Sequence, residues 1–142
     1  MNKEWNPIFQ IELMDIINSL QIEKLRVGSS DSLIYETMGE PELPVARLDT
    51  DRESKIFSHR YGNVDILSAN NTVIKIYIGM HGFRKNMVIL GRINSWKLND
   101  WLKLAKIKKW NVYTMCDVIR LEGKGIDIYV SPDGKVEAIS LF

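Results

Sequence analysis

The residues best suited to acid–base chemistry in this sequence are its two histidines, His59 and His81. An imidazole titrates near neutral pH, so two such rings could serve as the general acid and general base of a hydrolase. His59 falls within a predicted strand and His81 within a glycine-bounded loop, and nothing in their spacing forces the rings together. A small hydrolase or nuclease, with a site assembled from scattered residues, is therefore an alternative interpretation and not the leading one.

The sequence lacks the compact motifs of common catalytic and cofactor sites. It contains no G-x-S-x-G turn, no P-loop, no H-E-x-x-H and no C-x-x-C. The single cysteine, Cys116, follows Met115 among apolar residues and is predicted to be a buried or half-buried filler. Histidines and cysteines are too isolated for the usual metal-ligand clusters. The sequence thus predicts a protein that is not an enzyme, with no catalytic residues, no cofactor and no metal.

Charge is unevenly distributed along the chain. Residues 75–109 carry 9 basic side chains and 1 acidic one, whereas residues 1–74 carry 7 basic and 12 acidic ones. A nucleic-acid-binding module that uses the basic region is a further alternative. The isoelectric point is only about 7.8, and no aromatic-and-basic stacking motif accompanies the lysines. These features argue against nucleic acid as the partner and favour lysines that solvate one helix and one loop.

Three helices are expected from the apolar periodicity. The first begins at Pro7 with Asn6 as its N-cap, and its apolar residues continue to Leu20 at helical spacing. The second covers Asp31–Met38, and the third begins at residue 98 or 99. The charged stretch of residues 40–53 has two prolines and no period, so it is predicted to be a loop.

Elsewhere the apolar residues alternate with a period of two, which is typical of strands. A strong turn signal, Ser131-Pro132-Asp133-Gly134, separates the last two of them. The seven predicted strands, of which the fourth is the least regular, are Lys55–Arg60, Asn63–Leu67, Thr72–Ile78, Met87–Leu90, Val118–Leu121, Gly125–Val130 and Lys135–Leu141.

An internal repeat gives these elements an order. Asn63-Val64-Asp65-Ile66-Leu67 matches Gly125-Ile126-Asp127-Ile128-Tyr129, and each is followed by a turn and a similar apolar strand. The chain is predicted to be one α+β domain, residues 1–142, with helices on one side of a mainly antiparallel sheet of six or seven strands. Two helix-plus-three-strand meanders, residues 27–80 and 95–142, follow an extra N-terminal helix. Asp65 and Asp127 then face away from the core.

Location is predicted from the absence of targeting signals. No apolar run approaches the length of about 20 residues that a membrane span needs. The first residues lack the basic start and apolar stretch of a signal peptide, and one cysteine gives no disulfide framework. We therefore expect a cytoplasmic protein that does not associate with membranes.

The region of residues 27–80 carries a resemblance to a known class of proteins. Val27–Ser30 leads into a helix that ends at Met38–Pro41, and a later strand turns at Tyr61–Ile66. A helix with this Gly-x-Pro ending, followed by a meander whose middle strand opens Tyr-Gly-Asn, resembles small bacterial immunity-type proteins of polymorphic and contact-delivered toxin systems. The resemblance implies a non-enzymatic cytosolic protein that neutralises one cognate toxin by direct binding. It transfers no functional residue.

The acidic region from Glu36 to Glu53, which begins near the end of the second helix, is the predicted contact with a toxin. Trp96 lies beside a turn and is added as an aromatic anchor. The chain departs from the acidic composition common among inhibitors of nuclease toxins, because its net charge is only +1. A homodimer through open strands also stays possible. The candidate partner-binding residues are Glu36, Glu40, Glu42, Asp49, Asp51, Glu53 and Trp96.

Overall fold

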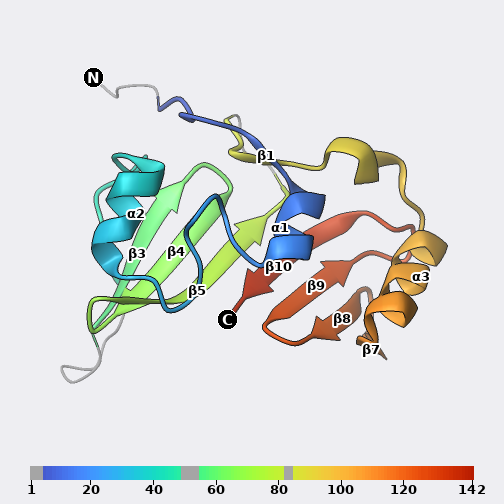
Figure 1. Ribbon diagram of the computed structural model, residues 1–142. Coiled ribbons are helices and arrows are strands. Elements are labelled where there is room, and N and C mark those ends of the chain that lie inside the picture. The colour runs from blue at the N-terminus through green and yellow to red at the C-terminus, as the bar shows by residue number, and fades with distance from the viewer. Residues whose placement is uncertain (1–4, 49–54, 82–84) are drawn as a thin grey trace.

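The computed structural model describes residues 5–48, 55–81 and 85–142, and these form an α+β fold (Figure 1). Within them, eight strands form one sheet in which every neighbouring pair is antiparallel. From one edge to the other the strands are β2 (Ala46–Arg47), β3 (Ile56–Tyr61), β4 (Val64–Ala69), β5 (Thr72–Gly79), β10 (Val136–Leu141), β9 (Ile126–Val130), β8 (Ile119–Gly123) and β7 (Asn111–Thr114).

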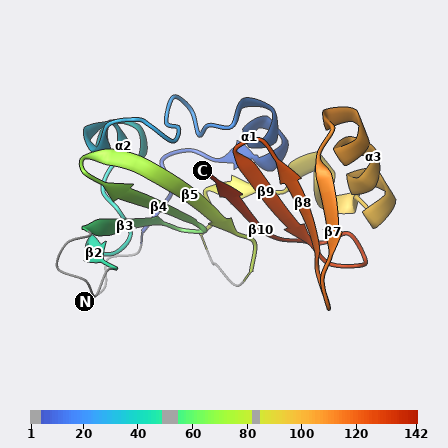
Figure 2. The ribbon, with the colours of Figure 1, turned by 90° about the horizontal axis from the view of Figure 1, so that it is seen from below.

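The helices all lie on the same face of this sheet (Figure 2). In the described part of the chain they are α1 (Leu13–Ser19), α2 (Asp31–Met38), α3 (Leu98–Lys108) and the short 3-10 helix η1 (Gly91–Ser95). The predicted α+β class and the antiparallel sheet are therefore confirmed. The main sheet has more strands than predicted, because β2 and β7 extend its two edges. None of the helices in the described ranges is long and apolar enough to cross a membrane.

The start of the N-terminal helix differs from the prediction. Residues 5–10 are not helical, and α1 begins only at Leu13. Ile11–Glu12 instead forms a short strand, β1, which pairs in parallel with β6 (Val88–Ile89). The Ile11 N–H donates to the Met87 carbonyl at 2.9 Å. This hydrogen bond to a residue distant in sequence keeps the backbone of Ile11 out of the helix.

The core lies between the sheet and the helices and follows the period of two along each strand. In α1, Leu13, Ile16 and Ile17 are buried, as the helical spacing predicts. The covered face of the sheet contributes a set of fully buried residues from both meanders. Its central members are Ile66, Ile76, Ile78, Leu121, Ile128 and Ile139.

The two meanders meet in the middle of the sheet, where β5 pairs with β10. The register places Ser140 opposite Tyr77. In the first half, α2 is followed along the chain by β2, β3, β4 and β5, which are neighbours in the sheet. In the second half, α3 is followed in the same way by β7, β8, β9 and β10. The origin of the two halves as copies of one unit stays a prediction.

A predicted turn fastens α3 to the sheet. The Gly134 N–H donates to the Ser131 carbonyl at 2.9 Å, which confirms the turn. The Trp101 indole N–H donates to the Gly134 carbonyl at 2.9 Å, and Trp101 is fully buried. Gly134 has φ of +92°, and a Cβ there would lie 2.5 Å from the Lys97 carbonyl carbon, so only glycine fits.

Candidate functional site

The face of the eight-stranded sheet opposite the helices, here called the open face, carries no helix of the described part of the chain (Figure 2). Residues that alternate with the core positions point to it. They include three tyrosines, of which Tyr77 and Tyr113 are 40% and 47% exposed, and Tyr129 is half-buried. Polar residues of this face include Lys75, Arg120, Glu122, Asp127 and Ser140.

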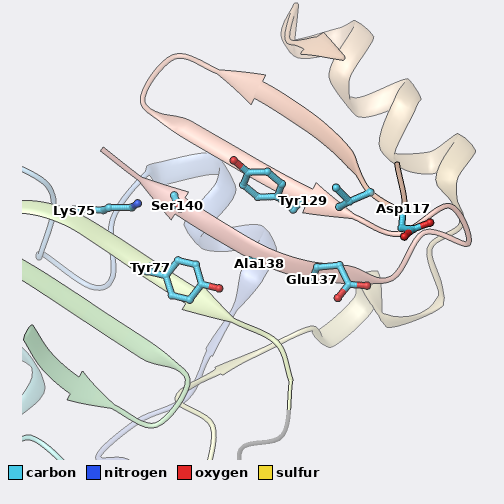
Figure 3. A pocket seen from close by; sticks show the side chains of 8 residues that line it. Lys75, Tyr77, Asp117, Tyr129, Glu137, Ala138 and Ser140 are labelled. Carbon is cyan, nitrogen blue, oxygen red and sulfur yellow. The ribbon is translucent and has the colours of Figure 1, made fainter. Parts of the chain in front are cut away.

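The central part of the open face is hollowed into what we call the sheet groove (Figure 3), with a volume of about 650 Å³. Its floor is β10, where the small side chains of Ala138 and Ser140 leave space. Tyr77 on β5 stands opposite Ser140, and Tyr129 on β9 stands opposite Ala138. The residues that line the groove are Lys75, Tyr77, Asp117, Val118, Tyr129, Glu137, Ala138 and Ser140.

The ends of the sheet groove carry opposite charges (Figure 3). Lys75 lies at one end, with its amino group directed toward Ser140. Glu137 and Asp117 lie at the other end. The imidazole Nε2 of His81 contacts a carboxylate oxygen of Glu137, and 67% of the His81 side chain is exposed. The groove therefore has a cationic end and a predominantly anionic end.

An ion cluster lies beside the groove on the open face. Arg120 donates to Glu122 at 2.7 Å and to Asp127 at 3.2 Å, and its guanidinium lies 5.7 Å from the Tyr113 ring centroid. Desolvation works against the charge, but the hydrogen bond to Asp127 and the charges of both carboxylates outweigh it and raise the pKa of Arg120. The Asp127 Oδ1 and Arg120 Nε atoms are buried without a hydrogen-bond partner in the described part of the chain.

The covered face of the first meander holds a different polar cluster. The His59 Nε2 lies 3.0 Å from the Ser68 hydroxyl, and its Nδ1 lies 3.4 Å from the Tyr35 hydroxyl. Burial lowers the pKa of His59, against the opposing effect of the charges of Asp31 and Asp65. This serine–histidine contact was not predicted, and both residues are more than nine-tenths buried. Its position in the core makes it a packing contact.

The structure does not bring the two histidines together. His59 points into the core from β3, and both of its ring nitrogens have partners there. His81 follows β5 and contacts Glu137 at the rim of the open face. In the described ranges, no three histidine, cysteine, aspartate or glutamate residues are grouped to hold a metal ion. Cys116 is exposed, so its predicted burial is wrong. The short β7–β8 connection holds it outside the core.

The predicted partner-binding residues lie away from the sheet groove where the structure describes them. Glu36 is exposed on α2, and Glu40 is exposed just beyond its end. Glu42 is exposed, but its carboxylate accepts the Gly62 N–H at 3.0 Å and helps to hold the β3–β4 turn. Trp96 is half-buried and packs edge-on against Trp101, with ring centroids 4.8 Å apart. The remaining candidates, Asp49, Asp51 and Glu53, lie outside the described residues.

Asp65 and Asp127 both lie on the open face, as the strand alternation predicts. Asp65 accepts a hydrogen bond from Ser58, and Asp127 accepts one from Arg120. Although it is on the open face, Asp127 is only 8% exposed, because neighbouring side chains surround it. The two aspartates therefore each accept a hydrogen bond from a neighbouring side chain of the open face, and the donors differ.

The sheet groove itself was missed in the sequence. Its tyrosines, Tyr77 and Tyr129, lie 52 residues apart in the chain, and the β5–β10 and β10–β9 registers together bring them to one site. One signal was present, since the small residues Ala138 and Ser140 alternate with the buried apolar residues Ile139 and Leu141 in this strand. Small residues flanked by larger ones on neighbouring strands leave a depression.

Comparisons of the chain with protein-family models, with curated proteins and with solved structures gave no match.

Proposed function

We propose that this chain is a non-enzymatic protein-binding module, that it docks a partner on the open face, and that the partner is a cognate toxin which it neutralises. The observation that carries the proposal is the open face itself. One face of an antiparallel sheet is normally solvated and polar, and here three tyrosines interrupt the polar residues. Tyrosine combines a large apolar ring with a hydrogen-bonding hydroxyl, and it is enriched in protein interfaces.

The arrangement of the ionisable groups supports binding over catalysis. A general acid–base pair needs two groups within reach of one substrate. The His59 ring contacts the hydroxyls of Ser68 and Tyr35 in the core, whereas the His81 ring contacts the Glu137 carboxylate at the surface. The choice of a toxin as the partner rests on the resemblance of residues 27–80 to immunity-type proteins. The acidic residues near α2 then form a second, outlying contact region in this proposal.

Co-expression with the protein encoded by the neighbouring gene tests the proposal directly. We expect a one-to-one complex that survives purification and restores growth to cells in which that neighbour is toxic. The double variant Tyr77→Ser with Tyr113→Ser removes exposed aromatic surface from the open face and should weaken the complex and the protection. Ile107→Ser is the matched control, because Ile107 is 77% exposed on α3 and lies off the open face. Protection that survives the tyrosine changes, or no complex at all, contradicts the proposal.

A nucleic-acid-binding module is a second candidate, and the outer side of α3 is the observation that favours it. Lys103, Lys106 and Lys109 are exposed there, next to the buried Trp101 and Ala105. Phosphate binding by such lysines releases counterions, so affinity for a fluorescent duplex should fall steeply between about 50 and 200 mM salt. The triple variant of these lysines to glutamine should then abolish binding. Unchanged affinity across that range would exclude this candidate.

A further inference from the structure

We propose that the sheet groove binds an arginine side chain of the protein partner, with the guanidinium at the end formed by Glu137 and Asp117. This inference rests on the proposed function and gives its interface a chemical specificity. The groove is a built concavity on an otherwise regular sheet, and a long side chain can enter it without any rearrangement of the backbone. Its volume of about 650 Å³ is ample for an arginine and part of the backbone that carries it.

The walls of the groove match the flat shape of a guanidinium. Tyr77 and Tyr129 rise from β5 and β9 on the two sides of β10, with Ala138 and Ser140 between them (Figure 3). A guanidinium stacks on aromatic rings and is attracted to their electron-rich faces. Its stem is apolar and can cover the methyl group of Ala138. Lysine shares the charge but has no planar group to place against a tyrosine ring.

The charges of the groove select a cation and give it a direction. Glu137 and Asp117 present two carboxylates at one end, and Lys75 is at the opposite end (Figure 3). The cluster of Arg120, Glu122 and Asp127 lies beside Ser140, and its one net negative charge attracts a cation to the groove without setting the cation's direction. A guanidinium is therefore attracted to the Glu137 end and repelled from the Lys75 end.

His81 leaves room for this contact. It reaches Glu137 through one ring nitrogen, whereas a carboxylate offers about four acceptor positions on its two oxygens. The Glu137 side chain is 37% exposed and accessible from the groove. Asp117 is exposed and adds a second acceptor group within the same lining. A guanidinium with five N–H donors can use both carboxylates at once.

Titration with two small isosteric probes, followed by the amide and tyrosine-ring NMR signals of the whole chain, tests the inference. The first probe is N-acetyl-argininamide, and the second is N-acetyl-citrullinamide, which keeps the shape and loses the charge. We expect saturable shifts for the arginine probe at Ala138, Ser140 and the rings of Tyr77 and Tyr129. The citrulline probe should bind about two- to fivefold more weakly, the range expected for the loss of one partly exposed ion pair. Equal binding of both probes, or shifts spread evenly over the surface, overturns the inference.

Variants locate the cation within the groove. The double change Glu137→Gln with Asp117→Asn should weaken arginine binding by about fivefold or more, for the same reason. Lys75→Gln removes a repelling charge and should strengthen it by about twofold. Asp15→Asn, at an exposed position of α1 on the helix side, is the matched control and should change nothing. Dispersed amide spectra of each variant establish that it folds. Arginine binding unaffected by the double change places the cation elsewhere and overturns the inference.

The two proposals fail in different ways. If the toxin complex forms and is indifferent to the Glu137 and Asp117 changes, the inference is wrong and the proposed function stands. If the arginine probe binds as expected but the neighbouring protein forms no complex, the proposed toxin partner is wrong and the groove retains its specificity for arginine.

Discussion

The two halves of the sheet share a strand arrangement but bury different chemistry against the helices. In the first half, the core side of β3 and β4 contains His59 and Ser68, which bond to each other under α2. In the second half, the core side of β8 and β9 is apolar, with Leu121 and Ile128 fully buried. The predicted repeat matches Asn63 to Gly125, and the same offset of 62 residues matches His59 to Leu121. Beneath the helices, the first half therefore adds a titratable, hydrogen-bonded pair to its apolar packing, whereas β8 and β9 contribute apolar side chains there.

Removing apolar volume from the second half should have the largest effect. Ile128→Ala leaves a cavity in a core that has no polar group to rearrange, and such changes typically cost about 2–5 kcal/mol. Denaturant unfolding measures the loss of free energy. Val112→Ala on the edge strand β7 is the control, because Val112 is 43% exposed and should cost less than about 1 kcal/mol. Similar losses for the two variants would mean that the second half is not packed as the structure shows.

The two halves each contain a glycine with nearly the same φ angle, but the surroundings of the two glycines differ. Gly28, in the first half, has φ of +98° with open space where a Cβ would lie, whereas Gly134 has φ of +92° and lies against the start of α3. Alanine at either position takes a left-handed conformation at a cost of about 1–2 kcal/mol. At Gly134 the new methyl group also meets backbone atoms of Lys97 and Leu98 at 2.5–2.7 Å. Gly134→Ala should therefore exceed Gly28→Ala by at least about 1 kcal/mol in unfolding experiments.

If the two alanine variants lose the same free energy, the contact between α3 and the turn at Gly134 does not restrict the backbone there.

Acid should weaken the first half through its buried histidine. Burial lowers the pKa of folded His59 below the ordinary value of 6.5, so the unfolded chain takes up the proton first as the pH falls. The stabilising effect of the neutral ring is then complete above about pH 6.5 and is lost progressively below it. One such group changes the unfolding free energy by at most about 1.4 kcal/mol per pH unit.

His59→Gln tests this pH dependence, because glutamine keeps polar atoms near Ser68 and does not titrate. The variant should lose less free energy than the wild type between pH 7 and pH 5, as measured by urea unfolding at several pH values. Ile128→Ala is the control, and its cost relative to the wild type should be the same at both ends of the range. Parallel pH curves for His59→Gln and the wild type would show that the buried ring does not control acid stability.

Regular patterns in the sequence predicted most of the fold. The bounds of α2, Asp31–Met38, and the turn at residues 131–134 were predicted as the structure has them. The two edge strands were missed because their residues are exposed on both sides, so no alternation marks them. The beginning of α1 was wrong because Ile11–Glu12 pairs with β6, a long-range contact that outweighs the local signal of Asn6 and Pro7.

The candidate site was less accessible to sequence reasoning. The sheet groove depends on a strand register between residues 76–79 and 138–141, and the sequence of one strand does not show which residue of a distant strand lies opposite it. The histidines drew attention because of their chemistry, yet one of them is a core residue with two hydroxyl partners. Residue type thus indicated which groups could react, but the cross-strand neighbours determine which groups meet.

The smallest expected difference lies between the matching aspartates of the open face. Asp65 accepts from the neutral Ser58 hydroxyl, whereas Asp127 accepts from the charged Arg120, which also binds Glu122 at 2.7 Å. Asp127→Asn should cost up to about 1 kcal/mol, because Arg120 keeps its second carboxylate, and Asp65→Asn should cost a few tenths. Raising the salt concentration to about 1 M should reduce the first loss only in part, because Asp127 is largely buried and such pairs are screened less than exposed ones, and should leave the second loss unchanged. If urea unfolding shows equal losses that ignore salt, the ion pair of the second half contributes nothing beyond a hydrogen bond, and the two halves then differ only beneath the helices.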